Sequence, residues 1–115
     1  MKRQQTISPI TGRPFIERDL ADRGQLSEYL ERARKAQAEW ALTSLEERAH
    51  ILTRAVEMIA ELRDQLAEEI TLQMGRPISQ SGGEIDGFVQ RAKAMIAQGP
   101  EALQHIEAPP TDGFR

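Results

Sequence analysis

The stretch LQMGRPISQSGGEIDGF, residues Leu72 to Phe88, decides the fold because one helical pattern ends in it and the next begins. It holds four of the eight glycines in this 115-residue chain. Gly75 followed by Pro77 predicts a helix end, since glycine suits the left-handed position after a helix and proline cannot continue one. Ser81 with Glu84 three residues later predicts a capping box, and thus the start of the next helix.

The same glycines raise the alternative of a phosphate-binding loop. A Walker-type loop needs a preceding strand and a Lys followed by Ser or Thr, and this stretch follows a long helical pattern and has no such pair. The spacing Gly-x-Gly-x-x-Gly of dinucleotide-binding turns cannot be placed on it either. A turn between two capped helices is therefore favoured.

Working outward from this turn, three helices and a hairpin are predicted. The preceding helix begins at Ser44, which with Glu47 forms another capping-box pattern, and its apolar face keeps the helical period up to Gly75. An earlier helix covers about Asp22 to Leu42, with Asp22 and Gln25 as its cap. The helix after the turn ends at Gly99-Pro100.

The first twenty residues contain two short β-friendly runs on either side of Pro9 to Gly12, which predicts a hairpin. The fold class is therefore mainly α, with an amino-terminal β-hairpin followed by three amphipathic helices. The expected division is residues 1–21 for the hairpin or edge strands, 22–98 for the three-helix segment, and 99–115 for an irregular tail. Three such helices form one layer and need a further surface for their apolar faces.

Composition removes several function classes. The net charge is −3 and no basic stripe occurs, so we expect no nucleic-acid partner. No apolar run approaches the ~18 residues of a membrane helix, so we expect no membrane partner. The absence of cysteine excludes disulfides, zinc–thiolate sites and thiol nucleophiles. It also fits a reducing compartment, and we expect a cytoplasmic location.

Few side chains are candidates for chemistry. His50 and His105 stand 55 residues apart in the sequence without further ligands at metal-binding spacing, so boundary or surface positions are favoured for both. Most acidic pairs fall at helix starts or on polar faces and are typical of solvated charge; Asp86 is the one that stays open. Apolar residues recur every seven positions from Leu45 to Leu66, but charged residues interrupt this pattern, which favours a globular packing face over a coiled coil.

Five segments in this order resemble the amino-terminal region of the NAD(P)-dependent aldehyde dehydrogenase superfamily. They are SPITG (8–12), ARKAQAEW (33–40), SLEERAHIL (44–52), LAEEITLQMGRP (66–77) and GEIDGF (83–88). The resemblance covers about Ile7 to Gln98. It implies that the chain is a piece of an α/β aldehyde dehydrogenase-type fold, truncated before the cofactor-binding core and the catalytic domain.

The resemblance implies that the parent enzyme oxidises aldehydes to carboxylic acids with NAD or NADP. In that family a cysteine, a glutamate and an asparagine carry the reaction, and all lie downstream of the matched region. No catalytic residue and no cofactor-binding residue can therefore be assigned here. We expect the chain alone to be non-catalytic and structural, and to bind no cofactor.

One site is implied by the resemblance. Several family members hold a structural monovalent cation with backbone carbonyls at the positions of Thr6 and Ile7 and a carboxylate at the position of Asp86. A further ligand in those members comes from a later part of the chain. Oxygen ligands of this kind suit such a cation.

The apolar helix faces need a cover, for which the simplest expectation is a homo-oligomer. An alternative to the enzyme fragment is a stand-alone helical module for interaction or oligomerisation. The two hypotheses differ in solution, because a module predicts a cooperative melt and a defined oligomer, whereas a fragment predicts a loose or aggregating chain.

Overall fold

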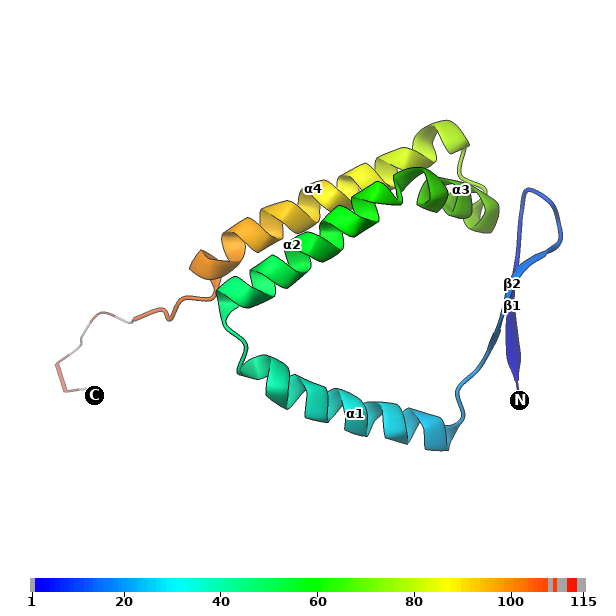
Figure 1. Ribbon diagram of the computed structural model, residues 1–115. Coiled ribbons are helices and arrows are strands. Elements are labelled where there is room, and N and C mark those ends of the chain that lie inside the picture. The colour runs from blue at the N-terminus through cyan, green and yellow to red at the C-terminus, as the bar shows by residue number, and fades with distance from the viewer. Residues whose placement is uncertain (1, 108, 110–111, 114–115) are drawn as a thin grey trace.

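The structure is a computed structural model that describes residues 2–107, 109 and 112–113. It consists of a two-stranded hairpin followed by four helices, in the order β1-β2-α1-α2-α3-α4 (Figure 1). The fold class expected from the sequence, mainly helical after an amino-terminal hairpin, is confirmed. Residues 108, 110–111 and 114–115 of the predicted tail lie outside the described residues.

The hairpin joins β1 (Arg3–Ile7) to β2 (Pro14–Asp19) in antiparallel register. The corner lies where the sequence predicts it, between Pro9 and Gly12. The Ser8 Oγ accepts hydrogen bonds from the amides of Ile10 (3.3 Å) and Thr11 (3.4 Å). Gly12 has a φ of 67°, a conformation that glycine adopts without a steric cost.

Helix α1 (Arg23–Ala41) begins at the predicted capping box. The Asp22 carboxylate accepts from the Gln25 amide, and the Gln25 side chain accepts from the Asp22 amide, both at 2.9 Å. These two bonds satisfy amides that would otherwise lack partners at the helix start.

The single helix predicted from Ser44 to Gly75 is wrong, because the chain forms two helices there. Helix α2 (Leu45–Glu61) and helix α3 (Arg63–Met74) meet at Leu62, whose φ and ψ are −87° and 9°. Both outer ends agree with the sequence: the Ser44 Oγ accepts from the Glu47 amide (3.1 Å), and Gly75 ends α3 with a φ of 76°. The break lets α2 and α3 each pack on a different part of α4, and neither Gly nor Pro marks it in the sequence.

Helix α4 (Ile78–Ala102) is longer at both ends than predicted. It begins after Pro77 and not at Ser81, because the Pro77 carbonyl accepts the first helical bonds from the amides of Gln80 (2.8 Å) and Ser81 (3.1 Å). It also passes through Pro100. A proline removes one backbone donor, and the next turn still closes with the Leu103 amide donating to the Gly99 carbonyl (3.0 Å).

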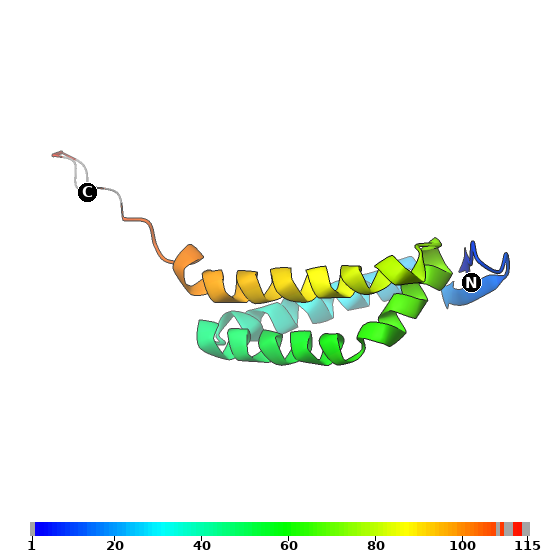
Figure 2. The same ribbon diagram turned by 90° about the horizontal axis from the view of Figure 1, so that it is seen from above.

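The packed pairs of elements are β1 with β2, α3 with α4, and α2 with α4; α1 belongs to none of them. In two perpendicular views α2 and α4 run side by side (Figures 1 and 2), and Figure 1 shows α1 apart from both. The apolar side chains buried among the described residues are Val56, Ala67 and Ile85, all at the contact of α4 with α2 and α3. The core is therefore a thin seam along α4.

The hairpin touches the turn between α3 and α4. A Cβ built on Gly75 would lie 3.0 Å from the Pro9 Cγ, and Ser8 beside it is almost fully buried. The chain thus forms an open frame, with the hairpin at one end of the helix pair and α1 running along its side (Figure 1).

Candidate functional site

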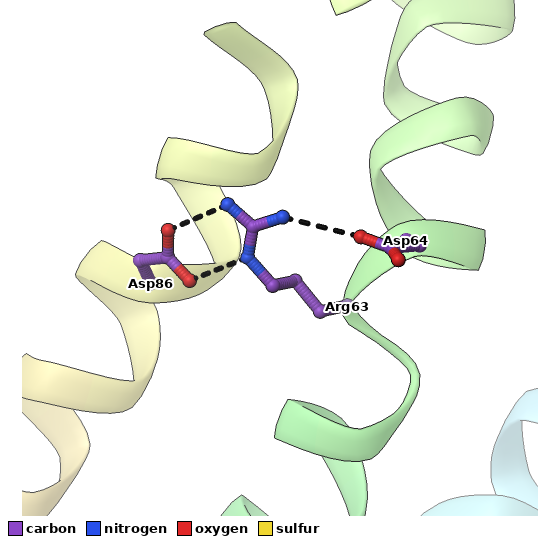
Figure 3. Close-up of polar contacts among 3 residues, drawn as sticks. All are labelled: Arg63, Asp64 and Asp86. Atoms are coloured by element: carbon purple, nitrogen blue, oxygen red, sulfur yellow. Dashed lines mark hydrogen bonds and ion pairs between the residues drawn. The ribbon is translucent and has the colours of Figure 1, made fainter. Parts of the chain in front are cut away.

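The densest group of polar contacts lies at the junction of α3 and α4, around Arg63. Its Nε donates to Asp86 Oδ1 (2.7 Å) and its Nη2 donates to Asp86 Oδ2 (2.8 Å), so the guanidinium binds both carboxylate oxygens. A third bond joins Arg63 Nη1 to Asp64 Oδ1 (3.2 Å). Figure 3 shows the guanidinium between the two carboxylates, with one on each helix. This two-point geometry fixes how the guanidinium and the carboxylate lie relative to each other.

Gly82 makes room for this pair. It lies one helical turn before Asp86 on α4, and a Cβ built there would come within 2.7 Å of the Arg63 Cζ. The guanidinium therefore crosses the helix directly over the backbone of Gly82 to reach Asp86. Gly83 next to it has nothing within 4 Å of an added Cβ, so only the first glycine of the doublet has this role.

The ion pair shifts the pKa values of both Arg63 and Asp86. The hydrogen bond from Arg63 is the largest cause that lowers the pKa of Asp86, and partial desolvation opposes it. The hydrogen bond to Asp86 is likewise the main cause that raises the pKa of Arg63. Asp86 is thus a carboxylate stabilised in its charged form, and a general acid needs the opposite shift.

Two further contacts tie the same junction together. The buried Ser81 hydroxyl bonds to Thr71 Oγ1 (2.9 Å) on α3 and donates to the Pro77 carbonyl (3.2 Å). Arg76 Nη1 lies 3.0 Å from Glu84 Oε1 across the start of α4. Ser81 and Glu84, predicted as a capping box, therefore work separately: one joins α4 to α3, and the other pairs with the preceding turn.

The monovalent-cation site that the resemblance implies, at Thr6, Ile7 and Asp86, stays a prediction. Thr6 and Ile7 lie on β1, paired with Ile16 and Pro14 of β2. Asp86 lies on α4 with both oxygens bound by the Arg63 guanidinium, a positive group that repels a metal ion. Cation binding at Asp86 rests on the resemblance alone.

The other candidates do not assemble into a reaction centre. His50 and His105 are both exposed. Among the described residues no group of three or more His, Asp or Glu side chains is arranged to hold a metal ion.

Two hollows with mostly apolar linings lie along the seam of α4. One cavity of about 410 Å³ opens where α3, α4 and the end of α2 meet, and a second of about 270 Å³ opens between the start of α2 and the end of α4. Together we name them the α4 groove. Its apolar lining includes Leu45, Leu52, Ile59, Leu66, Phe88 and Met95.

The sequence drew attention to Asp86 and to the glycine doublet but missed Arg63, which connects them. A usable signal exists: a glycine four residues before an aspartate on one helix leaves a bare strip of backbone ending at a carboxylate. Such a strip suits an arginine from a neighbouring helix. Which arginine reaches it depends on the break at Leu62, which the sequence does not reveal.

Comparison with known proteins identifies the family. The model of the aldehyde dehydrogenase family matches residues 1–113. The succinate-semialdehyde dehydrogenase [NADP(+)] of Deinococcus radiodurans is 32% identical over 108 residues, which are 94% of this chain and 23% of that protein. The chain belongs to the aldehyde dehydrogenase family.

Solved structures agree. The chain superposes on the NAD-dependent benzaldehyde dehydrogenase from Corynebacterium glutamicum with a TM-score of 0.83 at 28% identity, covering 97% of this chain and 24% of that one. The fold is also shared with Gox0499 (TM-score 0.83, 24% identity), of which 25% is covered. The chain corresponds to an amino-terminal segment of such an enzyme and spans about a quarter of the length of the relatives it matches.

In the part of the chain that the structure describes, no helix combines the length and the apolar character needed to cross a bilayer.

Proposed function

We propose that this chain is the structural, non-catalytic amino-terminal part of an NAD(P)-dependent enzyme that oxidises aldehydes to carboxylic acids. The observation that carries the proposal is the match of residues 1–113 to the aldehyde dehydrogenase family. The chain has no cysteine, which is the residue type that performs the nucleophilic step in that family. The polar contacts around Arg63 support a structural role, because they join α3 to α4 and hold the Asp86 carboxylate in an ion pair.

The names of the relatives give the proposal its chemical range. One acts on succinate semialdehyde and its name carries NADP(+), and another is a NAD-dependent benzaldehyde dehydrogenase. We therefore propose NAD or NADP as the cofactor of the whole enzyme, with no cofactor bound by this segment alone. The cysteine-free sequence supports a cytoplasmic location.

The test is direct. The purified chain is titrated with NAD and with NADP in a calorimeter, and NAD(P)H formation is followed with succinate semialdehyde and with benzaldehyde. We expect neither binding heat nor product. The full-length Deinococcus radiodurans enzyme is the positive control, and saturable binding of either dinucleotide by the chain would refute the proposal.

The exposed apolar side chains favour a second candidate, a helical oligomerisation module whose partner is a second copy of this chain. Leu42, Met58, Met74 and Met95 are all more than half exposed, and exposed apolar clusters commonly mark interaction surfaces. A cooperative thermal melt together with a single oligomeric species in sedimentation would favour this module over the enzyme segment.

A further inference from the structure

The bend between α2 and α3 lies in a segment whose sequence favours one continuous helix. Neither Gly nor Pro, the residues that usually account for a sharp bend, stands between the two helices. Apolar residues continue across the bend at three- and four-residue steps, at Ile59, Leu62, Leu66 and Ile70. The local sequence therefore does not require a bend at Leu62.

The bend also leaves backbone amides without helical partners. The N-cap residue of α3, Leu62, makes no side-chain hydrogen bond, and its carbonyl accepts from the Leu66 amide (2.9 Å). The amides of residues 63–65 come before that bond, so no carbonyl within α3 can accept from them. In one helix running through Leu62 they would donate to the carbonyls of residues 59–61. A straight helix over residues 45–74 would therefore gain a backbone bond for each of these amides.

Contacts with α4 hold the bent form. Arg63, the first residue of α3, binds both carboxylate oxygens of Asp86. Near the other end of α3, the Thr71 hydroxyl bonds to the buried Ser81 hydroxyl (2.9 Å). Ala67 lies between these two contacts and is buried. Figure 2 shows the segment after α2 turning toward the start of α4, which is the direction that these contacts require.

We propose that Leu62 is a hinge. Residues 45–74 are bent while the Arg63–Asp86 and Thr71–Ser81 contacts hold α3 on α4, and they form one straight helix when both contacts are lost. The bend is thus imposed by α4 and not by the sequence around Leu62. The proposal concerns the conformation of the chain and is independent of the proposed function.

The opposing contributions at the hinge are both small. The ion pair is exposed, with 44% of the Arg63 side chain and 58% of the Asp86 side chain accessible, and exposed pairs contribute little to stability. The amides at the start of α3 can bond to water in the bent form, so each backbone bond of the straight helix also has a small net value. Because neither side dominates, the loss of two polar contacts is enough to change the favoured conformation.

The cysteine-free sequence allows the bend to be measured with two introduced spin labels. His50→Cys and Met74→Cys place them on exposed positions of α2 and α3, 24 positions apart in the chain. A straight helix of that length spans about 36 Å, at a rise of 1.5 Å per residue. Pulsed electron paramagnetic resonance on the labelled full chain should give one main distance, clearly shorter than about 36 Å.

Removing both contacts should straighten the segment. In Asp86→Ala combined with Ser81→Ala, we expect a distance near about 36 Å to become the main population, with the helical circular dichroism signal retained. The short distance remaining as the main population in this double variant would overturn the proposal. A broad distribution with loss of helical signal would also overturn it, because the contacts would then keep α3 folded and not merely bent.

Two further variants show whether the effect belongs to the hinge. Glu84→Ala removes a carboxylate from the same helix whose partner, Arg76, lies in the turn before α4, and it should keep the short distance. Leu62→Gly, added to the double variant, should lower the long-distance population roughly threefold, because glycine disfavours a continuous helix. A long distance in Glu84→Ala, or an unchanged population with Leu62→Gly, would contradict a hinge at Leu62.

Discussion

Arg63 is the residue on which the junction of α3 and α4 depends. It stands directly after the break at Leu62 and binds both oxygens of Asp86 across the bare backbone of Gly82. Because the pair is exposed, its contribution to stability is modest and its geometric role is the larger one. It links the start of α3 to α4.

The two adjacent glycines provide a matched pair of variants for this junction. Gly83→Ala adds a methyl group in open space and should stabilise α4 by about 0.5–1 kcal/mol, the usual helix gain over glycine. Gly82→Ala should stabilise the fold by less than Gly83→Ala does, or destabilise it, because the added Cβ displaces the Arg63 guanidinium. Chemical denaturation of both variants measures the difference, and equal gains would contradict the assigned role of Gly82.

The same junction predicts a pH dependence. Arg63 lowers the pKa of Asp86 in the folded chain, so the pair stabilises the fold above the ordinary aspartate pKa of about 4 and this contribution is lost as pH falls through the lowered pKa. Carboxyl NMR should show that the pKa of Asp86 lies below the ordinary aspartate range in the unsubstituted chain, and closer to that range in Gly82→Ala. An unchanged titration in that variant would contradict the contact. Asp86→Asn provides the assignment control.

At the scale of the elements, Arg48 holds the corner between α1 and α2. Its Nε donates to the Thr43 carbonyl (2.9 Å), its Nη2 donates to the Ala41 carbonyl (3.0 Å), and its guanidinium lies 5.7 Å from the centre of the Trp40 ring. A positive group at the end of a helix satisfies free carbonyls and complements the helix dipole. A side chain of α2 thus caps the carboxyl end of α1.

Removing this side chain should free the end of α1. In Arg48→Ala we expect amide exchange in the last turn of α1 to accelerate roughly tenfold or more, since two hydrogen bonds from a charged donor are lost. Hydrogen exchange with mass spectrometry measures this. Arg54→Ala, on an exposed position of the same helix, is the control and should leave the turn unchanged.

The elements also show which features could be predicted from the sequence. The hairpin corner, the cap formed by Asp22 and Gln25, and the stop at Gly75 were predicted correctly, because each depends on local chemistry within a few residues. The break at Leu62 was missed, because neither Gly nor Pro marks it and α2 and α3 each pack on α4. The early start of α4 was missed, because the Pro77 carbonyl accepts the first helical bonds and the Ser81 side chain does not cap the helix. The Arg63–Asp86 pair was missed because its members are 23 positions apart.

At the scale of the whole molecule, the chain has a locally packed part and an exposed arm. Helices α2, α3 and α4 share the small core, whereas no residue of α1 is buried. Helices without tertiary packing are only marginally stable in water, even at lengths of about 15 residues. The arrangement of α1 therefore depends on what covers it.

This difference predicts the behaviour of the isolated chain in solution. Amides of α1 should exchange far faster than those in the middle of α4, because α1 has no buried residue and belongs to no packed pair. Hydrogen exchange on the isolated chain measures the difference. Equal protection of α1 and α4 in the isolated chain would mean that α1 is stabilised without a partner.

The contact between Pro9 and Gly75 has a consequence for the order of folding. It joins points separated by roughly 65 residues, and closing a loop of that size costs more entropy than forming neighbouring helical contacts. On a growing or refolding chain we therefore expect the junction of α3 and α4 to form first and the hairpin to settle on it afterwards. The hairpin, which is synthesised before the four helices, would then be the last element to reach its native position.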